Sequence, residues 1–465
     1  MLNFIDSEDE YKGPIKDNQQ VLGEGSYGCV IRPGFDSSLK ENTKKYVTKI
    51  SKIDFYSKNE CSISKQIKRI NKYHKYFMPI ISQSVIQFDK LKKSNFDINR
   101  CENLEEENSI SNFIKSYFFL LTLKYLNGIS PRDYFNKYNL NKNKFTKKYL
   151  YTFNHINNAI ILLNSKNIVH NDLYDRNILI QTKNNLPIVL DYGLSYNSNE
   201  LFNNKTINIE IINRFYFNYK PNHYNHLHEK NFINFIINNT HESSDLDYEN
   251  HYALVDNVKK NNDLTLETIM ICVNNFKQNF KKIFSDSNDR IYNLFSKKEF
   301  DYFLNSFEKY YTKFATDKNK YSTYYQILAE LLPNVFIYTD LYSVIFLYLE
   351  IFNNNNNSKN PIIEILHSFF KKIILADPSE RINPKQLKSM LNLIFNFIKK
   401  VDLNDEKNEI NNFIIEFDNN LKKIGINYDI FYNKNYAYVD FHEIFKNKLQ
   451  YLKKLNLNFD KLNIN

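Results

Sequence analysis

The chain has 465 residues, of which 42% are hydrophobic and 25% are charged, so it can bury a large core and does not have the composition of a disordered protein. Its length exceeds that of a usual single domain, and we therefore expect at least two lobes. The formal charge of +10 is spread over a lysine-rich chain without one dense basic block. We therefore do not expect nucleic acid as a partner.

The cysteines, the N-terminal residues and the apolar segments indicate in which cellular compartment the protein is expected. Cys29, Cys61, Cys101 and Cys272 form no CxxC pair, which predicts neither a zinc site nor a disulfide framework and fits a reducing compartment. The start, MLNFIDSEDEYKGP, is acidic where a signal peptide requires basic residues. The most apolar segments are far shorter than the ~20 residues that cross a bilayer. We expect a soluble, cytoplasmic protein without a membrane partner.

The predicted elements change character near residue 127. Before it, four segments read as strands bounded by glycine, proline or charged turns: VLGEGSYGCVIRP, KKYVTKI, FMPIISQSVIQF and SYFFLLTLKYL. After it, apolar residues recur at helical spacing in KKYLYTFNHINNAIILLNS and in the segments around 340–352, 361–375 and 385–400. The sequence predicts an α+β fold with a small β-rich lobe followed by a larger helical lobe.

The first motif is VLGEGSYGCV, in which Gly23, Gly25 and Gly28 have GxGxxG spacing, although the whole chain has only eight glycines. A loop without Cβ atoms can bring its amides close to phosphate oxygens. Dinucleotide-binding folds also use this spacing, but there the last glycine opens a helix. Here CVIRPG is β-branched and ends in proline and glycine, which favours a strand–loop–strand lid over a nucleotide.

The second motif is HNDLYDRN at residues 170–177, between the apolar runs AIILL and ILI. A turn between apolar segments has no structural need for so many polar groups, although a solvated loop is the alternative. The third motif, PIVLDYGLS, places Asp191 19 residues after Asp172. That interval has room for two short strands, ILIQ and PIVL, joined by the turn KNNL.

These motifs, in this order, resemble the eukaryotic-type protein kinase superfamily. Val47, Thr48 and Lys49 are similar to the family's third-strand lysine motif, which implies that Lys49 binds the α and β phosphates of ATP. The family pairs that lysine with a glutamate on the next helix, and Glu60 is the only glutamate between positions 42 and 101. The interval of 11 residues from Lys49 to Glu60 is short for the family. The resemblance implies an ATP-binding set of Leu22, Gly23, Gly25, Gly28, Val30, Val47, Lys49, Glu60 and, through hinge backbone, Leu123, Lys124, Tyr125 and Leu126.

The resemblance also implies catalytic roles. His170 would anchor the loop, Asp172 would orient the substrate hydroxyl and accept its proton, and Asn177 and Asp191 would bind magnesium. Gly193 would have a structural role in the DYG segment. Metal ions and lysine are needed because the transferred phosphoryl group carries dispersed negative charge.

Two later segments extend the resemblance. TDLYSVIF is similar to the family's central helix, whose aspartate, here Asp340, bonds the backbone of the catalytic loop; alternatively, Thr339 or Asp340 caps an ordinary helix. ADPSERINPKQL is similar to the motif with the family's structural arginine, here Arg381. The glutamate that pairs with this arginine has two candidate motifs between residues 191 and 340. NYKPNHY offers His223 in place of an acid, and ILAELLPN offers Glu330, which we prefer.

We expect an N-terminal tail over 1–17, a kinase N-lobe over 18–126, a C-lobe over 127–400 with an insertion at about 225–325, and a helical extension over 401–465. The interval of 149 residues between Asp191 and Asp340 holds the insertion, where the family usually has a few dozen residues. The insertion reads as helices and loops and not as disorder.

Specificity and regulation depend on three neighbours of Asp172. Tyr174 stands where serine/threonine kinases usually have lysine, and Arg176 stands where tyrosine kinases often have arginine, so the motif is ambiguous. Asn171 replaces the arginine that often pairs with an activation-segment phosphate. We expect that such phosphorylation is not required, unless a lysine elsewhere replaces that arginine.

The expected activity is ATP- and Mg²⁺-dependent transfer to serine or threonine of a protein substrate. A pseudokinase scaffold and a small-molecule kinase are the alternatives. GSYGCVIRPG and the composition are similar to serine/threonine kinases of large DNA viruses of protists, which would imply the host cytoplasm or the virion. The oligomeric state is open.

Overall fold

The structure is a computed structural model, and the parts of the chain that it describes form two compact units. The described residues are 20–25, 28–35, 45–92, 101, 117–137, 142–203, 206–216, 227–230, 232–233, 270, 273–274, 278, 295, 297–317, 319–321, 324–354, 361–376, 378, 381–400 and 419. The first unit comprises Met1–Lys137 and Ser165–Asn197, and the second comprises Tyr138–Asn164 and Ser198–Asn465. The motif HNDLYDRN therefore clusters with the N-terminal region and not with the helices that precede and follow it.

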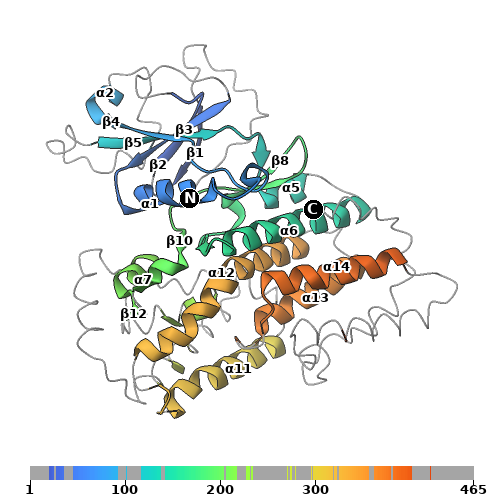
Figure 1. Ribbon diagram of the computed structural model, residues 1–465. Coiled ribbons are helices and arrows are strands. Elements are labelled where there is room, and N and C mark those ends of the chain that lie inside the picture. The colour runs from blue at the N-terminus through green and yellow to red at the C-terminus, as the bar shows by residue number, and fades with distance from the viewer. Residues whose placement is uncertain are drawn as a thin grey trace. The chain divides into compact units, whose positions relative to one another are not determined.

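The first unit contains a five-stranded antiparallel sheet with strand order β1-β2-β3-β5-β4 (Figure 1). The strands are β1 (Gln20–Gly25), β2 (Gly28–Arg32), β3 (Tyr46–Lys52), β4 (Ser82–Gln87) and β5 (Tyr117–Lys124). Each overlaps a segment that the sequence predicts as a strand, although β1 begins one residue earlier and β3 ends two residues later than the predicted segments. The glycine motif forms the antiparallel hairpin β1–β2, as its β-branched continuation indicates.

Gly28 is required by the sheet itself. Its φ is +150°, in a region that side-chain-bearing residues rarely adopt, and a Cβ at this position would overlap the carbonyl oxygen of Ile50 on β3. The register places Gly28 opposite Ser51, so β2 approaches β3 closely at the start of its run. The third glycine of the motif thus has a packing role, whatever the loop binds.

The helix α1 (Phe55–Ile67) follows β3 almost directly. Asp54 caps its N-terminus: the side chain accepts from the Ser57 amide at 2.7 Å, while Ser57 Oγ accepts from the Asp54 amide at 3.1 Å. This capping box fixes where the helix starts. The face of α1 that bears Glu60 and Cys61 is consequently buried.

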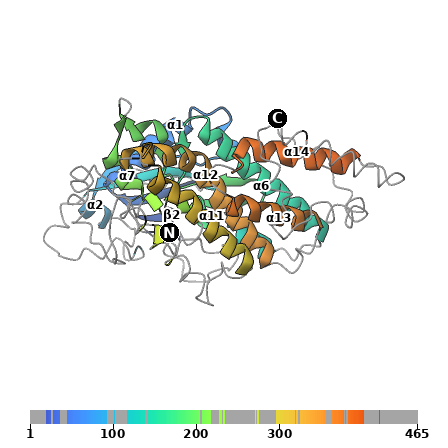
Figure 2. The same ribbon diagram turned by 90° about the horizontal axis from the view of Figure 1, so that it is seen from below.

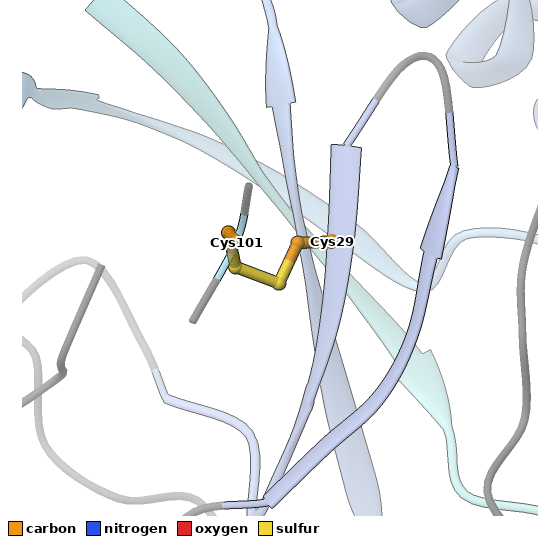
Figure 3. The surroundings of a disulfide bond; sticks show 2 residues. All are labelled: Cys29 and Cys101. Atoms are coloured by element: carbon orange, nitrogen blue, oxygen red, sulfur yellow. A yellow bond between two sulfur atoms is a disulfide. The ribbon is translucent and has the colours of Figure 1, made fainter. Parts of the chain in front are cut away.

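A disulfide joins Cys29 on β2 to Cys101 (Figure 3), and it corrects the prediction that no cysteines are paired. The two residues are 72 positions apart, and both belong to the core cluster on one face of the sheet. Their proximity results from chain folding and leaves no short-range pattern, which explains why spacing did not reveal it. Cys61 is a buried free thiol, and Cys272 lies outside the described residues.

The rest of the first unit positions the polar motifs. A three-stranded sheet has the order β6-β8-β9, and β7 pairs with β10 in a short ladder. Their bounds are β6 (Gly128–Ile129), β7 (Ile168–Val169), β8 (Ile178–Gln181), β9 (Pro187–Val189) and β10 (Tyr196–Asn197), and α5 (Pro131–Lys137) follows β6. The two strands that the sequence predicts between Asp172 and Asp191 are therefore β8 and β9.

The second unit is mainly helical. Its long helices are α6 (Lys142–Asn164), α11 (Lys297–Thr316), α12 (Tyr324–Asn353), α13 (Pro361–Leu375) and α14 (Pro384–Lys400), and its shorter elements are β11 (Phe202–Asn203), β12 (Thr206–Ile207) and α7 (Ile209–Tyr216). The helix α12 contacts α6, α13 and α14, as Figures 1 and 2 show. Buried polar links join them, since Tyr149 donates to the Tyr348 carbonyl at 2.8 Å and Asn157 donates to the Pro384 carbonyl at 3.0 Å.

The helix α12 differs from its prediction. It begins at Tyr324 and passes through Pro333, so Thr339 and Asp340 lie in its interior and do not cap it. Its segment Gln326–Asn353 has the length and apolar composition of a membrane span, which corrects the expectation that the apolar segments are far shorter. However, 78% of an apolar 18-residue window within it is buried in the structure, which is typical of a core helix. The expected tail, most of the insertion and the extension beyond residue 400 lie outside the described residues.

Candidate active site

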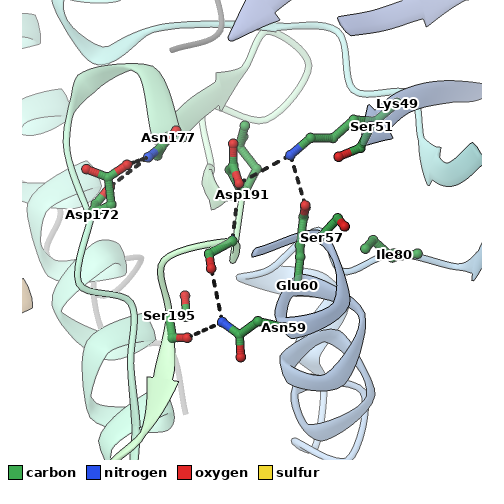
Figure 4. A network of polar contacts seen from close by, with 12 residues as sticks. Lys49, Ser51, Ser57, Asn59, Glu60, Ile80, Asp172, Asn177, Asp191 and Ser195 are labelled. Atoms are coloured by element: carbon green, nitrogen blue, oxygen red, sulfur yellow. Dashed lines mark hydrogen bonds and ion pairs between the residues drawn. The ribbon is translucent and has the colours of Figure 1, made fainter. Parts of the chain in front are cut away.

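Lys49 on β3 lies between two carboxylates (Figure 4). Its Nζ is 2.9 Å from Glu60 Oε2 and 3.4 Å from Asp191 Oδ1. Lys49 and Glu60 are buried, whereas the Asp191 side chain is 24% exposed. The lysine–glutamate pair that the sequence suggests is thus present despite the short interval, because the capping box starts α1 immediately after β3.

Neighbouring charges determine the protonation states of Lys49 and Asp191. Burial alone would lower the pKa of Lys49, but the carboxylates of Asp191 and Glu60 outweigh burial and raise it. Burial opposes ionisation of Asp191, yet Lys49 and the Gly193 amide lower the pKa of that carboxyl below its usual value. At neutral pH the lysine is therefore a cation and Asp191 is an anion.

The HNDLYDRN loop follows β7 and is fixed by main-chain contacts. His170 Nε2 lies 3.1 Å from the Leu190 carbonyl, and Ser195 Oγ donates to the His170 carbonyl at 3.1 Å. Asn171 has φ of +67°, a conformation that asparagine tolerates well, and donates to the Leu194 carbonyl at 3.2 Å. These bonds attach the loop directly to residues on both sides of Asp191.

Asp172 and Asn177 are oriented against each other. Asn177 Nδ2 donates to the Asp172 carbonyl at 2.7 Å and to its carboxylate Oδ2 at 2.9 Å (Figure 4). Asn177 is buried, while Asp172 is half-buried and keeps access to solvent. A buried amide therefore presents a carboxylate at the surface of the unit, which suits a group that must meet an incoming hydroxyl.

Asn177 and Asp191 lie at the same end of the β8–β9 hairpin. Ile178 pairs with Val189, and the Leu190 amide donates to the Asn177 carbonyl at 3.1 Å. Asp191 itself has φ of +62°, and the Gly193 amide donates to its Oδ1 at 3.3 Å. The hairpin thus brings together the two predicted metal ligands, which are 14 positions apart in the sequence.

The donor chemistry of this pair fits magnesium. Carboxylate and amide oxygens are hard ligands, and Mg²⁺ commonly uses one or two protein oxygens together with substrate phosphates and water. Among the described residues no group of three or more histidine, cysteine, aspartate or glutamate side chains could hold a metal without a substrate. Asp191 and Asn177 would hold the ion, which would neutralise phosphate charge when a nucleotide binds.

The apolar residues predicted to bind ATP also converge. Leu22, Val30, Val47 and Leu123 belong to one buried cluster, against which Tyr125 and Leu126 pack. Gly23 and Gly25 lie in β1, whereas Ser26 and Tyr27 at the hairpin tip lie outside the described residues. Side chains from β1, β2, β3 and β5 thus meet, as an apolar base for an adenine ring requires.

Tyr125 of the predicted hinge contacts other residues of the first unit. The Tyr125 amide donates to the Lys45 carbonyl at 2.8 Å, and the Arg32 guanidinium lies 3.5 Å from the centre of the Tyr125 ring. Lys124 is exposed at the end of β5, opposite Tyr46. The Tyr125 amide is therefore already bonded within the protein and is not free to bond an adenine ring, and the expected hinge bonding stays a prediction for the other residues.

In the second unit, the partner of Arg381 is Glu229 and not Glu330. Arg381 forms a buried ion pair with Glu229 and a hydrogen bond with His228. Burial, and then the charge of Arg381, lower the pKa of His228 well below its usual value, so its Nε2 accepts from the arginine. The segment LHEK at 227–230 supplies this pair, which corrects the preference for Glu330 and leaves His223 outside the described residues.

Glu330 has other partners. It lies in α12 and binds Lys313 at 2.6 Å and Lys320 at 2.8 Å, and it accepts from Tyr321. The sequence did not indicate Glu229, because LHEK lacks the Ala-Pro-Glu pattern that is typical of protein kinases at this glutamate. The short interval is the signal that could have identified it, since Glu229 lies only 38 positions after Asp191, whereas Glu330 lies beyond the insertion. Asp340 is buried in α12, and its bond to the catalytic loop stays a prediction.

Parts of this chain are similar to known protein kinases. Residues 17–212 match the family model described as protein tyrosine and serine/threonine kinase. The chain is 30% identical over 176 residues to the "Probable inactive serine/threonine-protein kinase samkD" of Dictyostelium discoideum. That match covers 35% of this chain and 29% of the relative, so the chain spans less than a third of the relative's length. The antiparallel sheet, the helical C-terminal part and the family match show a bilobal kinase-type fold. The matched parts of the chain are similar to protein kinases of the eukaryotic type.

Proposed function

We propose that the chain transfers the γ-phosphoryl group of ATP, with magnesium, to serine or threonine hydroxyls of proteins. The observation that carries the proposal is the convergence of Lys49–Glu60, Asp191 and Asp172–Asn177 in one compact unit. A kinase requires a cation for the phosphates, oxygen ligands for a metal and a carboxylate for the acceptor. Lys49 is a cation, Asp191 and Asn177 offer oxygen atoms, and Asp172 is a carboxylate, which supports the proposal.

Each residue then has one role. Lys49 binds the α and β phosphates and is held in place by Glu60. Asp191 and Asn177 hold magnesium, which supplies charge neutralisation at the phosphates. Asp172 orients the acceptor hydroxyl and takes its proton, and its carboxylate is fixed by Asn177 Nδ2.

The acceptor specificity is supported by less direct observations. Burial and the nearby Asp172 carboxylate raise the pKa of Tyr174, so this side chain is a neutral phenol where serine/threonine kinases usually have lysine. Arg176 remains the feature that favours tyrosine as the acceptor. We prefer serine and threonine because the Dictyostelium relative is named as a serine/threonine-type protein.

A catalytically inactive binding scaffold is the second candidate, and the word "inactive" in that relative's name favours it. A scaffold has no chemical need for Lys49, Asp172, Asn177 and Asp191 together, so we rank it below the kinase. A small-molecule kinase is the third reading, because related folds keep the same aspartate and asparagine spacing.

One assay separates these candidates. Purified protein is incubated with γ-labelled ATP and Mg²⁺, and with either casein-like proteins or small alcohols, and the products are hydrolysed to identify the labelled amino acid. Labelled phosphoserine or phosphothreonine that disappears in Asp172→Asn supports the proposal. Labelled alcohol alone would favour a small-molecule kinase, and no transfer in the presence of nucleotide binding would favour the scaffold.

A further inference from the structure

Asn59, the residue before Glu60 on α1, contacts the segment after Asp191 through its side-chain amide. Its Nδ2 donates to the Gly193 carbonyl at 3.0 Å and to the Ser195 carbonyl at 2.5 Å (Figure 4). One amide group thus holds two main-chain acceptors two residues apart. Consecutive residues of a helix point about 100° apart, so α1 reaches Lys49 with Glu60 and the DYG segment with Asn59.

These contacts form a closed circuit. Lys49 binds Glu60 and Asp191, the Gly193 amide donates to Asp191 Oδ1, and the Gly193 carbonyl accepts from Asn59. The helix backbone joins Asn59 to Glu60 and completes the ring. Since every link restrains its neighbours, displacing α1 would move the lysine–glutamate pair and the carboxylate of Asp191 together.

The same helix face makes a second contact two turns later. Asn197 Nδ2 donates to Gln66 Oε1 at 2.8 Å, and Gln66 lies seven positions after Asn59. On its other side the segment is held by Asn171, through the Leu194 carbonyl, and by the β7–β10 pairing. Neutral amides therefore fasten residues 193–197 between α1 and the loop that carries Asp172.

We infer that Asn59 is a positioning residue that couples α1 to Asp191, so that the Lys49–Glu60 pair and the metal-binding carboxylate adopt their working geometry together. The inference rests on the proposed phosphoryl transfer and deepens it. Asn59 touches neither nucleotide nor metal in this scheme. Its effect is transmitted through the Gly193 carbonyl and the Gly193 amide to Asp191.

Two substitutions separate lost donors from lost volume. Asn59→Asp keeps the size of the side chain but removes its N–H donors and directs a carboxylate at two carbonyl oxygens. Asn59→Ala removes donors and volume without adding repulsion. If the donors matter, the Asp variant is the more impaired; if packing matters, the Ala variant is. Ser62→Ala, on an exposed position of the same helix, is the matched control.

The first measurement is amide hydrogen exchange of the nucleotide-free full chain, followed over residues 190–198 and α1. We expect faster exchange at 193–197 in both Asn59 variants and no change in Ser62→Ala. This measurement needs no activity, so it tests the contact even if the proposed function is wrong. Unchanged exchange at 193–197 would overturn the inference.

The second measurement is the Mg²⁺ concentration for half-maximal binding of a fluorescent ATP analogue. Loss of about one to two neutral hydrogen bonds should raise it on the order of tenfold in Asn59→Ala, and further in Asn59→Asp, because Asp191 loses its restraint. A purely structural role would lower the melting temperature but leave the Mg²⁺ requirement of the folded protein unchanged, and that result overturns the inference. If the wild type binds no Mg²⁺–nucleotide, the proposed function fails, and the positioning role fails with it, whatever the exchange data show.

Discussion

At the scale of single residues, Lys49 and Asp191 should be the most sensitive to substitution. Asp191→Asn removes the proposed metal ligand and one carboxylate from Lys49, and Lys49→Ala leaves Glu60 and Asp191 without their shared cation. Loss of one such charge contact commonly costs ~3 kcal/mol of transition-state stabilisation, or about a hundredfold in rate. We expect Asp191→Asn to abolish transfer and Lys49→Ala to reduce it at least a hundredfold in a γ-labelled ATP assay.

The matched control is Asp172→Asn. In the proposed mechanism the Asp172 carboxylate contacts the acceptor hydroxyl and not the phosphates, so nucleotide affinity should stay close to that of the wild type while transfer falls. Parallel loss of affinity and rate in this variant would mean that the substitution disturbs the fold. Transfer at the wild-type rate by both Asp191→Asn and Lys49→Ala would contradict the assigned site.

Sequence reasoning identified the charged residues of the site and Asn177, but it missed Asn59, whose amide holds the segment after Asp191. Glu60 could be assigned because no other glutamate lies nearby, and Asp172, Asn177 and Asp191 occur at family spacing. Asn59 donates only to main-chain carbonyls, and such a contact leaves no complementary side chain to find in a sequence. In a chain so rich in asparagine, the residue type itself carries little information.

At the scale of elements, the segment containing Glu229 and the loop before α14 are joined by the Arg381 ion pair. Removing one partner of a buried pair typically costs ~3–5 kcal/mol, whereas an exposed pair is worth roughly 0–1 kcal/mol. We expect Glu229→Gln to lower the unfolding midpoint far more than Glu330→Gln in thermal or urea denaturation followed by circular dichroism. The opposite order would restore Glu330 as the partner of Arg381.

Glu330 also makes the stability of the second unit depend on pH. Partial burial opposes ionisation, but hydrogen bonds from Lys313, Lys320 and Tyr321 lower the pKa of Glu330 from 4.5 to about 2. A carboxyl whose folded pKa is depressed stabilises the native state above its unfolded pKa and loses that contribution as pH falls through the folded pKa. The stability difference between wild type and Glu330→Gln should therefore be full at pH 6, and shrink between about pH 4.5 and 2. A difference that is constant over this range would contradict the ion pairs.

The strands of the first sheet and most of the long helices were predictable, whereas the start of α12 was not. Alternating and helical apolar patterns identified all five strands of the first sheet and the helices α6, α13 and α14. Thr339 and Asp340 have the chemistry of a helix cap, yet Thr339 Oγ1 donates to the Val335 carbonyl four residues back, inside the helix. A threonine hydroxyl can form a hydrogen bond both at a helix start and inside a helix, so the residue type does not show where α12 begins. The burial of the turns before Thr339 determines that the helix continues to the N-terminal side.

At the scale of the whole molecule, the absence of an arginine at Asn171 bears on activation. The segment after Asp191 is held by amide and main-chain contacts from α1, β7 and the catalytic loop, none of which needs a phosphate. We expect phosphatase-treated protein, checked by mass spectrometry, to retain most of its transfer activity. A large loss that is restored by autophosphorylation within 195–225 would point to another cation that replaces the missing arginine.

The insertion should support the second unit through α11. His228 packs in edge contacts with Phe303, Phe307 and Tyr311 of this helix, directly beside Glu229. Excising residues 230–320 removes these rings, so we expect loss of transfer activity while a nucleotide analogue still binds to the first unit. Phe307→Ala is the milder variant and should destabilise the protein by about 3–5 kcal/mol. Full activity after the excision would show that α11 is dispensable.

The close approach of β2 to β3 affects how relatives of this chain can be recognised. Because a Cβ at Gly28 would overlap a carbonyl oxygen of the neighbouring strand, any protein that keeps this hairpin must keep the glycine, including one that has stopped transferring phosphate. The third glycine of the motif therefore indicates that the sheet is present and does not indicate ATP binding. A search for inactive members of this group should disregard it and compare Lys49, Asp172, Asn177 and Asp191 instead.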